Sequence, residues 1–178
     1  DAPVPTDLYS FTDKAGAYSI SVNGKKINAK QYDGYATISR TWKAGDVVEI
    51  SLPMDVRRIK ANDNVEDDRG KLAIERGPIM FCLEGKDQVD SIVFNKFIPD
   101  GTSMEAAFDA DLLNGVVVLT GHAKEIGKDG SVKEVPFKAI PYSTWNNRGA
   151  DQMAVWIPEA AEYAHPTPEP TIASKART

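Results

Sequence analysis

Polar and apolar residues alternate in short runs along most of this chain, which is the pattern of half-buried β-strands. In residues 47–52, V-V-E-I-S-L, one side carries Val48, Ile50 and Leu52, and the residues between them face the other way. Pro53 then ends the strand, because proline cannot donate a hydrogen bond to a sheet. The pattern predicts a strand with one strongly apolar face just before Pro53.

Turn signals separate the other predicted strands. Asn23 and Gly24, within residues 19–27, predict a hairpin because both residue types tolerate positive φ. The remaining strand candidates cover residues 35–42, 71–76, 79–83, 91–94, 103–108, 115–120, 135–142 and 152–157. Many short strands at this spacing favour an all-β fold, an antiparallel β-sandwich or jelly roll. Residues 104–113 contain good helix formers, so a helix is the alternative there.

Two segments break the strand pattern. Residues 57–70 are polar and rich in charge, and we interpret them as a connection with one short strand. From Pro158 onward the chain is rich in proline, which is typical of a linker.

The composition narrows the class of protein. The 178 residues are 42% hydrophobic and 26% charged, with a net charge of -5. A nucleic-acid-binding protein usually shows a basic stripe, and this sequence has none. No apolar run approaches the roughly 20 residues of a membrane-spanning helix, and residues 1–7 lack the pattern of a signal peptide. The sequence therefore predicts a globular protein with no nucleic-acid partner and no membrane span.

The single cysteine, Cys82, is a candidate nucleophile or metal ligand. A catalytic cysteine needs an electropositive, partly exposed setting, usually with a histidine nearby. Cys82 lies instead in the apolar run I-M-F-C-L, residues 79–83, which is typical of a strand buried on both faces. We therefore interpret Cys82 as part of the core.

Metal ligands are sparse in this sequence. One of the two histidines, His122, lies in a predicted turn and the other, His165, in the predicted linker, so we predict no zinc site. The acidic residues within 63–68 could suit calcium, but they lack the spacing of an EF-hand loop. We interpret them as a solvated loop.

Residues 142–149, Y-S-T-W-N-N-R-G, are the best candidate for a carbohydrate site. The ring of Trp145 could stack on a sugar, and polar groups that could bond hydroxyls come from Asn146, Asn147 and Arg148. The alternative is that Trp145 closes an edge of the sandwich. No carboxylate pair, phosphate loop or nucleophile elbow stands out, so no catalytic residue is predicted.

Three segments, in the same order and spacing, resemble one family. They are D-G-Y-A-T-I-S-R-T-W-K-A-G-D-V-V-E-I-S-L-P-M (33–54), D-R-G-K-L-A-I-E-R-G-P-I-M-F-C-L-E (68–84) and A-I-P-Y-S-T-W-N-N-R-G-A-D-Q-M-A-V-W-I-P (139–158). The family is glycoside hydrolase family 127, the β-L-arabinofuranosidase family, once catalogued as a domain of unknown function. The resemblance covers roughly residues 3–158 and is with the C-terminal β-sandwich region only.

The resemblance implies how the chain is divided. Residues 1–55 are expected to form part of a middle β-sandwich domain, and residues 56–158 the C-terminal β-sandwich domain. Residues 159–178 are expected to be a proline-rich linker or tail. A middle sandwich that lacks its earlier strands would leave the apolar face within residues 35–52 uncovered, which favours a homodimer.

The resemblance also implies a catalytic partner. Family members carry an upstream (α/α)6 barrel, in which a zinc-bound cysteine is the nucleophile and a glutamate the acid/base. Neither motif has a counterpart here, so no catalytic residue is transferred and zinc is expected only in the barrel. The chain alone is expected to be inactive.

The expected role is therefore a non-catalytic accessory region of a glycoside hydrolase that acts on arabinofuranoside-containing glycans. The sequence does not determine the localisation; the periplasm or the outside of the cell is expected if the chain comes from a glycan-degrading bacterium. Two alternatives stay open. One is a carbohydrate-binding module centred on Trp145, and the other is a purely structural spacer domain.

Overall fold

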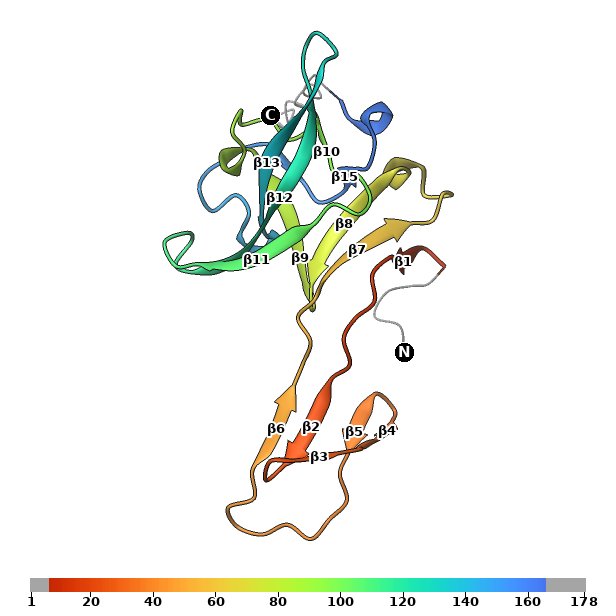
Figure 1. Ribbon diagram of the computed structural model, residues 1–178, viewed down its shortest axis with the longest axis vertical. Helices are drawn as coiled ribbons and strands as arrows, with labels where there is room; N and C mark the ends of the chain where they lie inside the picture. Colours follow the sequence, from red (N-terminus) through yellow and green to blue (C-terminus); the bar gives the residue numbers. More distant parts are fainter. Residues whose placement is uncertain (1–6, 166–178) are drawn as a thin grey trace, which may run out of the picture.

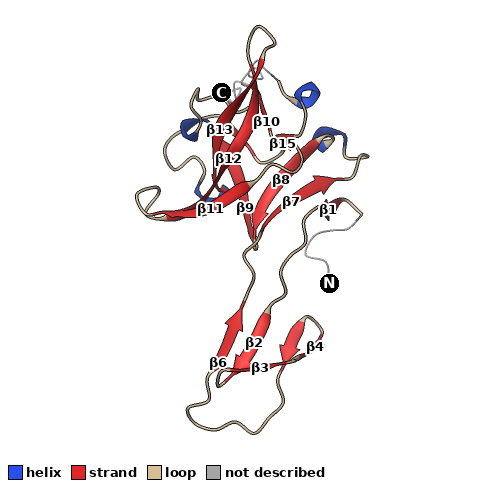
Figure 2. Ribbon diagram, viewed as in Figure 1, coloured by secondary structure: helices blue, strands red, loops and turns tan. Residues whose placement is uncertain are grey.

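The computed structural model describes residues 7–165, which form two lobes joined by two extended segments (Figure 1). Both lobes consist of strands, with only short helical turns between them (Figure 2). Every strand pair in the described residues is antiparallel. The predicted all-β class with antiparallel sheets is confirmed.

The lower lobe contains a three-stranded sheet and a separate two-stranded hairpin. Asn23 and Gly24 both adopt positive φ, so the predicted hairpin forms between the first two strands. The sheet has the order β3-β2-β6, and the hairpin pairs β4 with β5. The strands are β2 (Ser19–Val22), β3 (Lys25–Ile27), β4 (Lys30–Tyr32), β5 (Tyr35–Thr37) and β6 (Val48–Ser51).

The upper lobe is one curled sheet with the order β1-β7-β8-β9-β13-β12-β10. In addition, β11 pairs with the first half of β12, β14 with β9 and β15 with β8. Because β8, β9 and β12 change partners along their length, the sheet wraps around a core. Its strands are β1 (Tyr9–Phe11), β7 (Val56–Ala61), β8 (Lys71–Arg76), β9 (Ile79–Glu84), β10 (Lys96–Phe97), β11 (Met104–Asp109), β12 (Val116–Ile126), β13 (Val132–Pro141), β14 (Met153–Ala154) and β15 (Ile157–Pro158), with 3-10 turns at η1 (Glu66–Asp68), η2 (Gly85–Asp87), η3 (Tyr142–Thr144) and η4 (Ala161–Tyr163).

The upper lobe buries both faces of β9. The main core lies on one face and includes Phe81 and Leu83. On the opposite face Cys82 packs with Val118 and Ile140 in a smaller cluster. Cys82 is 0% exposed, which confirms the prediction that it belongs to the core.

A buried lysine fastens the loop between β9 and β10 to β12. Lys96 is 1% exposed, and its ammonium lies 2.5 Å from the carboxylate of Asp90, 2.7 Å from the carbonyl of Ile92 and 3.4 Å from the carboxylate of Glu125. Burial raises the pKa of Asp90, but hydrogen bonds, chiefly from Lys96, outweigh this effect and hold the pKa below its ordinary value. The buried ammonium is therefore paired, as a buried charge must be.

The strand predicted for residues 103–108 is confirmed as β11, so the alternative helix does not form. Three other predicted strands differ from the structure. The strand predicted for residues 35–42 ends at Thr37, as β5. Residues 91–94 are a loop and not a strand. Val93 is nevertheless buried in the core, because the carbonyl of Ile92 accepts a hydrogen bond from the buried ammonium of Lys96. The predicted strand at 152–157 is two short strands, β14 and β15, which pair with different partners.

Two segments at the ends of the described residues pack on the upper lobe. β1, assigned by the resemblance to the middle domain, pairs with β7, and its Tyr9 ring stacks on Trp156 at 5.7 Å. Residues 159–165, expected to begin a linker, also dock there: Ala164 is buried, and the ring of Tyr163 covers Gly70. The proline content predicts a linker from this point, but Tyr163 and Ala164 pack against the upper lobe. Residues 166–178 lie outside the described residues.

Candidate functional site

The candidate carbohydrate site is the aromatic loop, residues 142–149, which follows β13. Its first turn, η3, is closed by the hydroxyl of Thr144, which donates to the carbonyl of Pro141 at 2.7 Å. Asn146 adopts φ +63, in the left-handed region that asparagine tolerates. The side chain of Asn147 then donates to the carbonyl of Thr144 at 3.0 Å. Local hydrogen bonds therefore fix the shape of this loop.

Only part of the Trp145 side chain is exposed to solvent. Its ring is half-buried and packs on the cluster that contains Cys82. Tyr142 is the more exposed aromatic residue, at 45%, and the two rings are nearly parallel with centroids 6.5 Å apart. Trp145 therefore covers the small core, as the alternative interpretation expects, and Tyr142 presents the open aromatic face.

Arg148 is bound within the protein. Its guanidinium pairs with the carboxylate of Glu84, which is 1% exposed, and lies 2.5 Å from that of Asp87. The backbone N–H of Asn146 also donates to Glu84, at 3.0 Å. The Asp87 carboxylate, followed by that of Glu84, raises the pKa of Arg148 above its ordinary value. The geometry thus gives Arg148 a structural task, which is to anchor the aromatic loop to β9 and η2.

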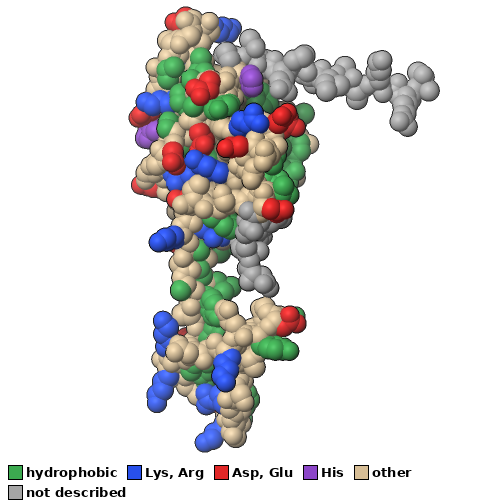
Figure 3. Space-filling view, turned by 90° about the vertical axis from the view of Figure 1, so that its right-hand side faces the viewer, with side chains coloured by type: hydrophobic (Ala, Val, Ile, Leu, Met, Phe, Trp, Pro, Cys, Tyr) green, Lys and Arg blue, Asp and Glu red, His purple; other side chains and the backbone are tan. Residues whose placement is uncertain are grey.

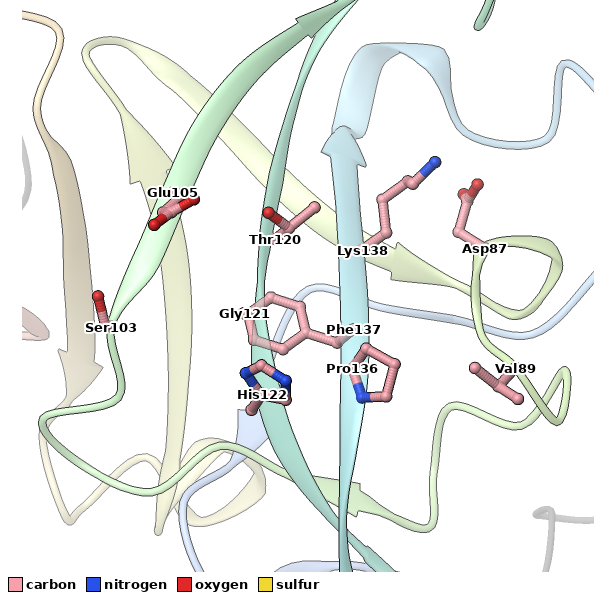
Figure 4. A pocket seen from close by; sticks show the side chains of 10 residues that line it. All are labelled: Asp87, Val89, Ser103, Glu105, Thr120, Gly121, His122, Pro136, Phe137 and Lys138. Carbon is pink, nitrogen blue, oxygen red and sulfur yellow. The ribbon is translucent and has the colours of Figure 1, made fainter.

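A surface groove of about 440 Å³ lies beside this anchor, on the outer face of β11, β12 and β13 (Figure 4). Asp87, which Arg148 binds, is part of one wall. We call this surface the strand groove. Its lining residues are Asp87, Val89, Ser103, Glu105, Thr120, Gly121, His122, Pro136, Phe137 and Lys138.

Cross-strand register arranges the polar groups of the strand groove. Glu105 lies opposite Thr120, and Thr120 lies opposite Lys138. The three side chains therefore form one row across the strands, with neighbours roughly 5 Å apart. A second row, two residues along each strand, contains His122 and Pro136 (Figure 4). These rows could not be predicted from the sequence, because their members come from three strands whose register is set only by folding.

A third surface feature is the apolar face of the lower lobe. Ile20 and Ile50 are cross-strand partners, as are Val22 and Val48. The side chains on β2 are buried, but Val48 and Ile50 on β6 are 43% and 62% exposed, and Leu52 beyond them is 67% exposed. Hydrophobic side chains reach the surface of this lobe among lysines and arginines (Figure 3). The apolar face predicted for residues 47–52 is thus present and largely uncovered.

Residues 7–165 offer no arrangement for the zinc that the resemblance assigns to the barrel. No three His, Cys, Asp or Glu side chains gather there in a way that could hold a metal ion. In the same residues, no helix has the length and hydropathy to cross a membrane.

Comparisons with known proteins agree with the geometry. Residues 9–54 match the domain described as beta-L-arabinofuranosidase, GH127 middle domain. Residues 56–158 match the glycoside hydrolase family 127 C-terminal domain. Among curated proteins, a non-reducing end beta-L-arabinofuranosidase from Bifidobacterium longum subsp. longum is 32% identical, over 79% of this chain and 24% of its own length.

Solved structures give the same relationship. A GH127 beta-arabinofuranosidase superposes with a TM-score of 0.84 and 37% identity, over 91% of this chain and 26% of its own. A GH127 beta-L-arabinofuranosidase from Geobacillus stearothermophilus T6 gives 0.76 and 38%, over 81% and 25%. The chain spans about a quarter of the length of these relatives. It belongs to glycoside hydrolase family 127, and it corresponds to the middle and C-terminal domains of that family.

Proposed function

We propose that this chain is a non-catalytic accessory region of a glycoside hydrolase that acts on arabinofuranoside-containing glycans. Its partner would be an upstream catalytic barrel of the same protein, against which the sandwich region packs. The match to non-catalytic family domains over a quarter of the relatives' length supports this role.

The uncovered apolar face of the lower lobe is the observation that carries the proposal. A three-stranded sheet gains its stability from packing its apolar face, and exposed apolar patches of this kind mark interaction sites. On β6, Val48 and Ile50 lie on the face that they share with Ile20 and Val22, and Glu49 and Ser51 lie on the other; all four β6 residues are exposed. The strand therefore offers an apolar face for a partner and a polar face for solvent.

The test compares the isolated chain with a longer polypeptide that includes the upstream residues. The isolated chain should not hydrolyse an aryl β-L-arabinofuranoside, whereas the longer protein should. At a concentration too low for self-association, Ile50→Asp should change the stability of the isolated chain by no more than about 0.5 kcal/mol, because the side chain is already exposed. In the longer protein the same change should lower thermal stability clearly, since it would bury a charge in the interface.

Ser51→Asp is the matched control, because Ser51 is exposed on the opposite face of β6. It should leave both proteins unchanged. The proposal is wrong if the purified isolated chain hydrolyses the substrate, or if Ile50→Asp affects both proteins equally.

The alternative of a carbohydrate-binding module centred on Trp145 is less well supported. Trp145 is half-buried and Arg148 is committed to Glu84 and Asp87. The exposed side chains of that loop are those of Tyr142, Ser143, Asn146 and Asn147, and that of Asn147 is bound to the carbonyl of Thr144.

A further inference from the structure

The structure assigns a second role to this region, and it rests on the proposed function. We propose that the strand groove on β11, β12 and β13 binds a short stretch of neutral glycan. A sugar chain would lie across the strands, along the row formed by Glu105, Thr120 and Lys138.

The groove is formed before any ligand arrives. Gln88 is 5% exposed, and its side-chain amide donates to the carbonyl of Lys138 at 2.9 Å, which fastens one wall to β13. Arg148 holds Asp87 in the same wall. The opposite wall is β11, which pairs with β12 from Met104 to Asp109. A preorganised site loses less conformational entropy on binding.

A glycine lets the wall on β11 approach closely. A Cβ atom at Gly121 would come within 2.7 Å of the carbonyl oxygen of Ser103 and 2.8 Å of the Phe137 ring. A larger residue would therefore push the start of β11 away from β12. Gly121 thus keeps Ser103 and Glu105 at the edge of the groove.

The charges in the groove disfavour an anionic ligand. Arg148 is shared between Asp87 and Glu84, so this wall keeps a net negative charge, and Lys138 lies 3.7 Å from the carboxylate of Asp109. Glu105 is exposed, so a phosphate or carboxylate ligand would meet an unfavourable charge there. Lys138, the one Lys or Arg among the residues that line the groove, is already paired with Asp109, and an anionic ligand would have to compete for it.

The remaining polar groups favour a polyhydroxylated ligand over a peptide or lipid. The hydroxyl of Thr120 and the imidazole of His122 can each donate or accept a hydrogen bond, as sugar hydroxyls can. Exposed apolar lining is limited to Val89 and Pro136, because the Phe137 ring is 2% exposed. Neighbouring strands lie roughly 4.8 Å apart, so successive sugar rings crossing the sheet would meet successive side chains.

The experiment titrates the ¹⁵N-labelled chain with a short arabinan oligosaccharide and follows amide shifts by NMR. Shifts should concentrate at β11, β12 and β13 around Thr120. The variant Glu105→Ala/Thr120→Ala/Lys138→Ala should lose about tenfold or more in affinity, since it removes several hydrogen bonds at once. Thr120→Lys, which fills the middle of the row, should give a similar loss if the triple variant does not fold.

Lys124→Ala/Glu134→Ala is the matched control. These residues form the next exposed pair on the same two strands, beyond the groove. The control should bind as the unchanged chain does. Inorganic phosphate and an oligogalacturonate should bind the unchanged chain no better than they bind the triple variant.

Three results would overturn the proposal. They are an absence of shifts, equal losses in the control, and shifts confined to the aromatic loop, which would favour the Trp145 alternative instead. None of them bears on the accessory role, because that role is tested by hydrolysis and by Ile50→Asp and does not require glycan binding.

Discussion

At the scale of single residues, Cys82 shows how neighbours decide chemistry. The thiol is fully buried between two apolar layers. Burial, with smaller contributions from the charges of Glu84 and Asp87, raises the pKa of Cys82 from 9.0 to about 12. A thiol in this state is a small apolar side chain and not a nucleophile.

We therefore expect Cys82 to react slowly with a thiol reagent in the folded protein and rapidly in denaturant. Cys82→Ala should cost about 1 kcal/mol or more, as small core truncations do. Because folding raises this pKa, the thiol stabilises the fold fully below pH 9.0 and loses that contribution as the pH rises towards about 12.

The measurement is a labelling time course, together with urea unfolding at neutral and alkaline pH. In Cys82→Ala the part of the alkaline destabilisation due to the thiol should disappear. Rapid labelling of the native protein would show that the burial of Cys82 is wrong.

At the scale of elements, the aromatic loop depends on one buried ion pair. Arg148 joins the loop to Glu84 on β9, and Glu84 has almost no contact with solvent. Arg148→Met should cost about 3–5 kcal/mol, because it leaves a buried carboxylate without its partner. Adding Glu84→Gln should recover part of this loss, since one of the two uncompensated charges is then gone, while that of Asp87 remains.

Urea unfolding of the two single variants and the double variant measures this coupling. Arg69→Met is the control, because Arg69 is exposed and bonds only the carbonyl of Asp63. A neutral effect of Arg148→Met would mean that the side chain is free, as a sugar contact requires.

At the scale of the whole molecule, the isolated chain should associate with itself. β6 is an edge strand with an exposed apolar face, and such an edge pairs readily with another chain. We expect light scattering to show dimers that form with rising concentration, through residues 35–52. Ile50→Asp should shift the protein to monomer, whereas Ser51→Asp should not.

A strict monomer at high concentration, combined with strong hydrogen-exchange protection in β6, would contradict this prediction. In that case the lower lobe would cover its own apolar face in solution.

Alternation and turn residues determined much of the fold by themselves. The all-β class, the hairpin at Asn23-Gly24 and the burial of Cys82 follow from side-chain period and turn chemistry, which are local properties. The family relationship could also be recognised from the order and spacing of three sequence segments. The apolar face of residues 47–52 could be predicted as well, since it depends only on which residues alternate.

Only the tertiary structure decided where the polar side chains act. Arg148 looked available for a sugar until folding placed Glu84 and Asp87 beside it. The row of Glu105, Thr120 and Lys138 exists only because three strands pair in one register. Long-range pairing sets such contacts, and the physical reason they escape sequence analysis is that strand register and ion-pair partners depend on the packing of the whole sheet.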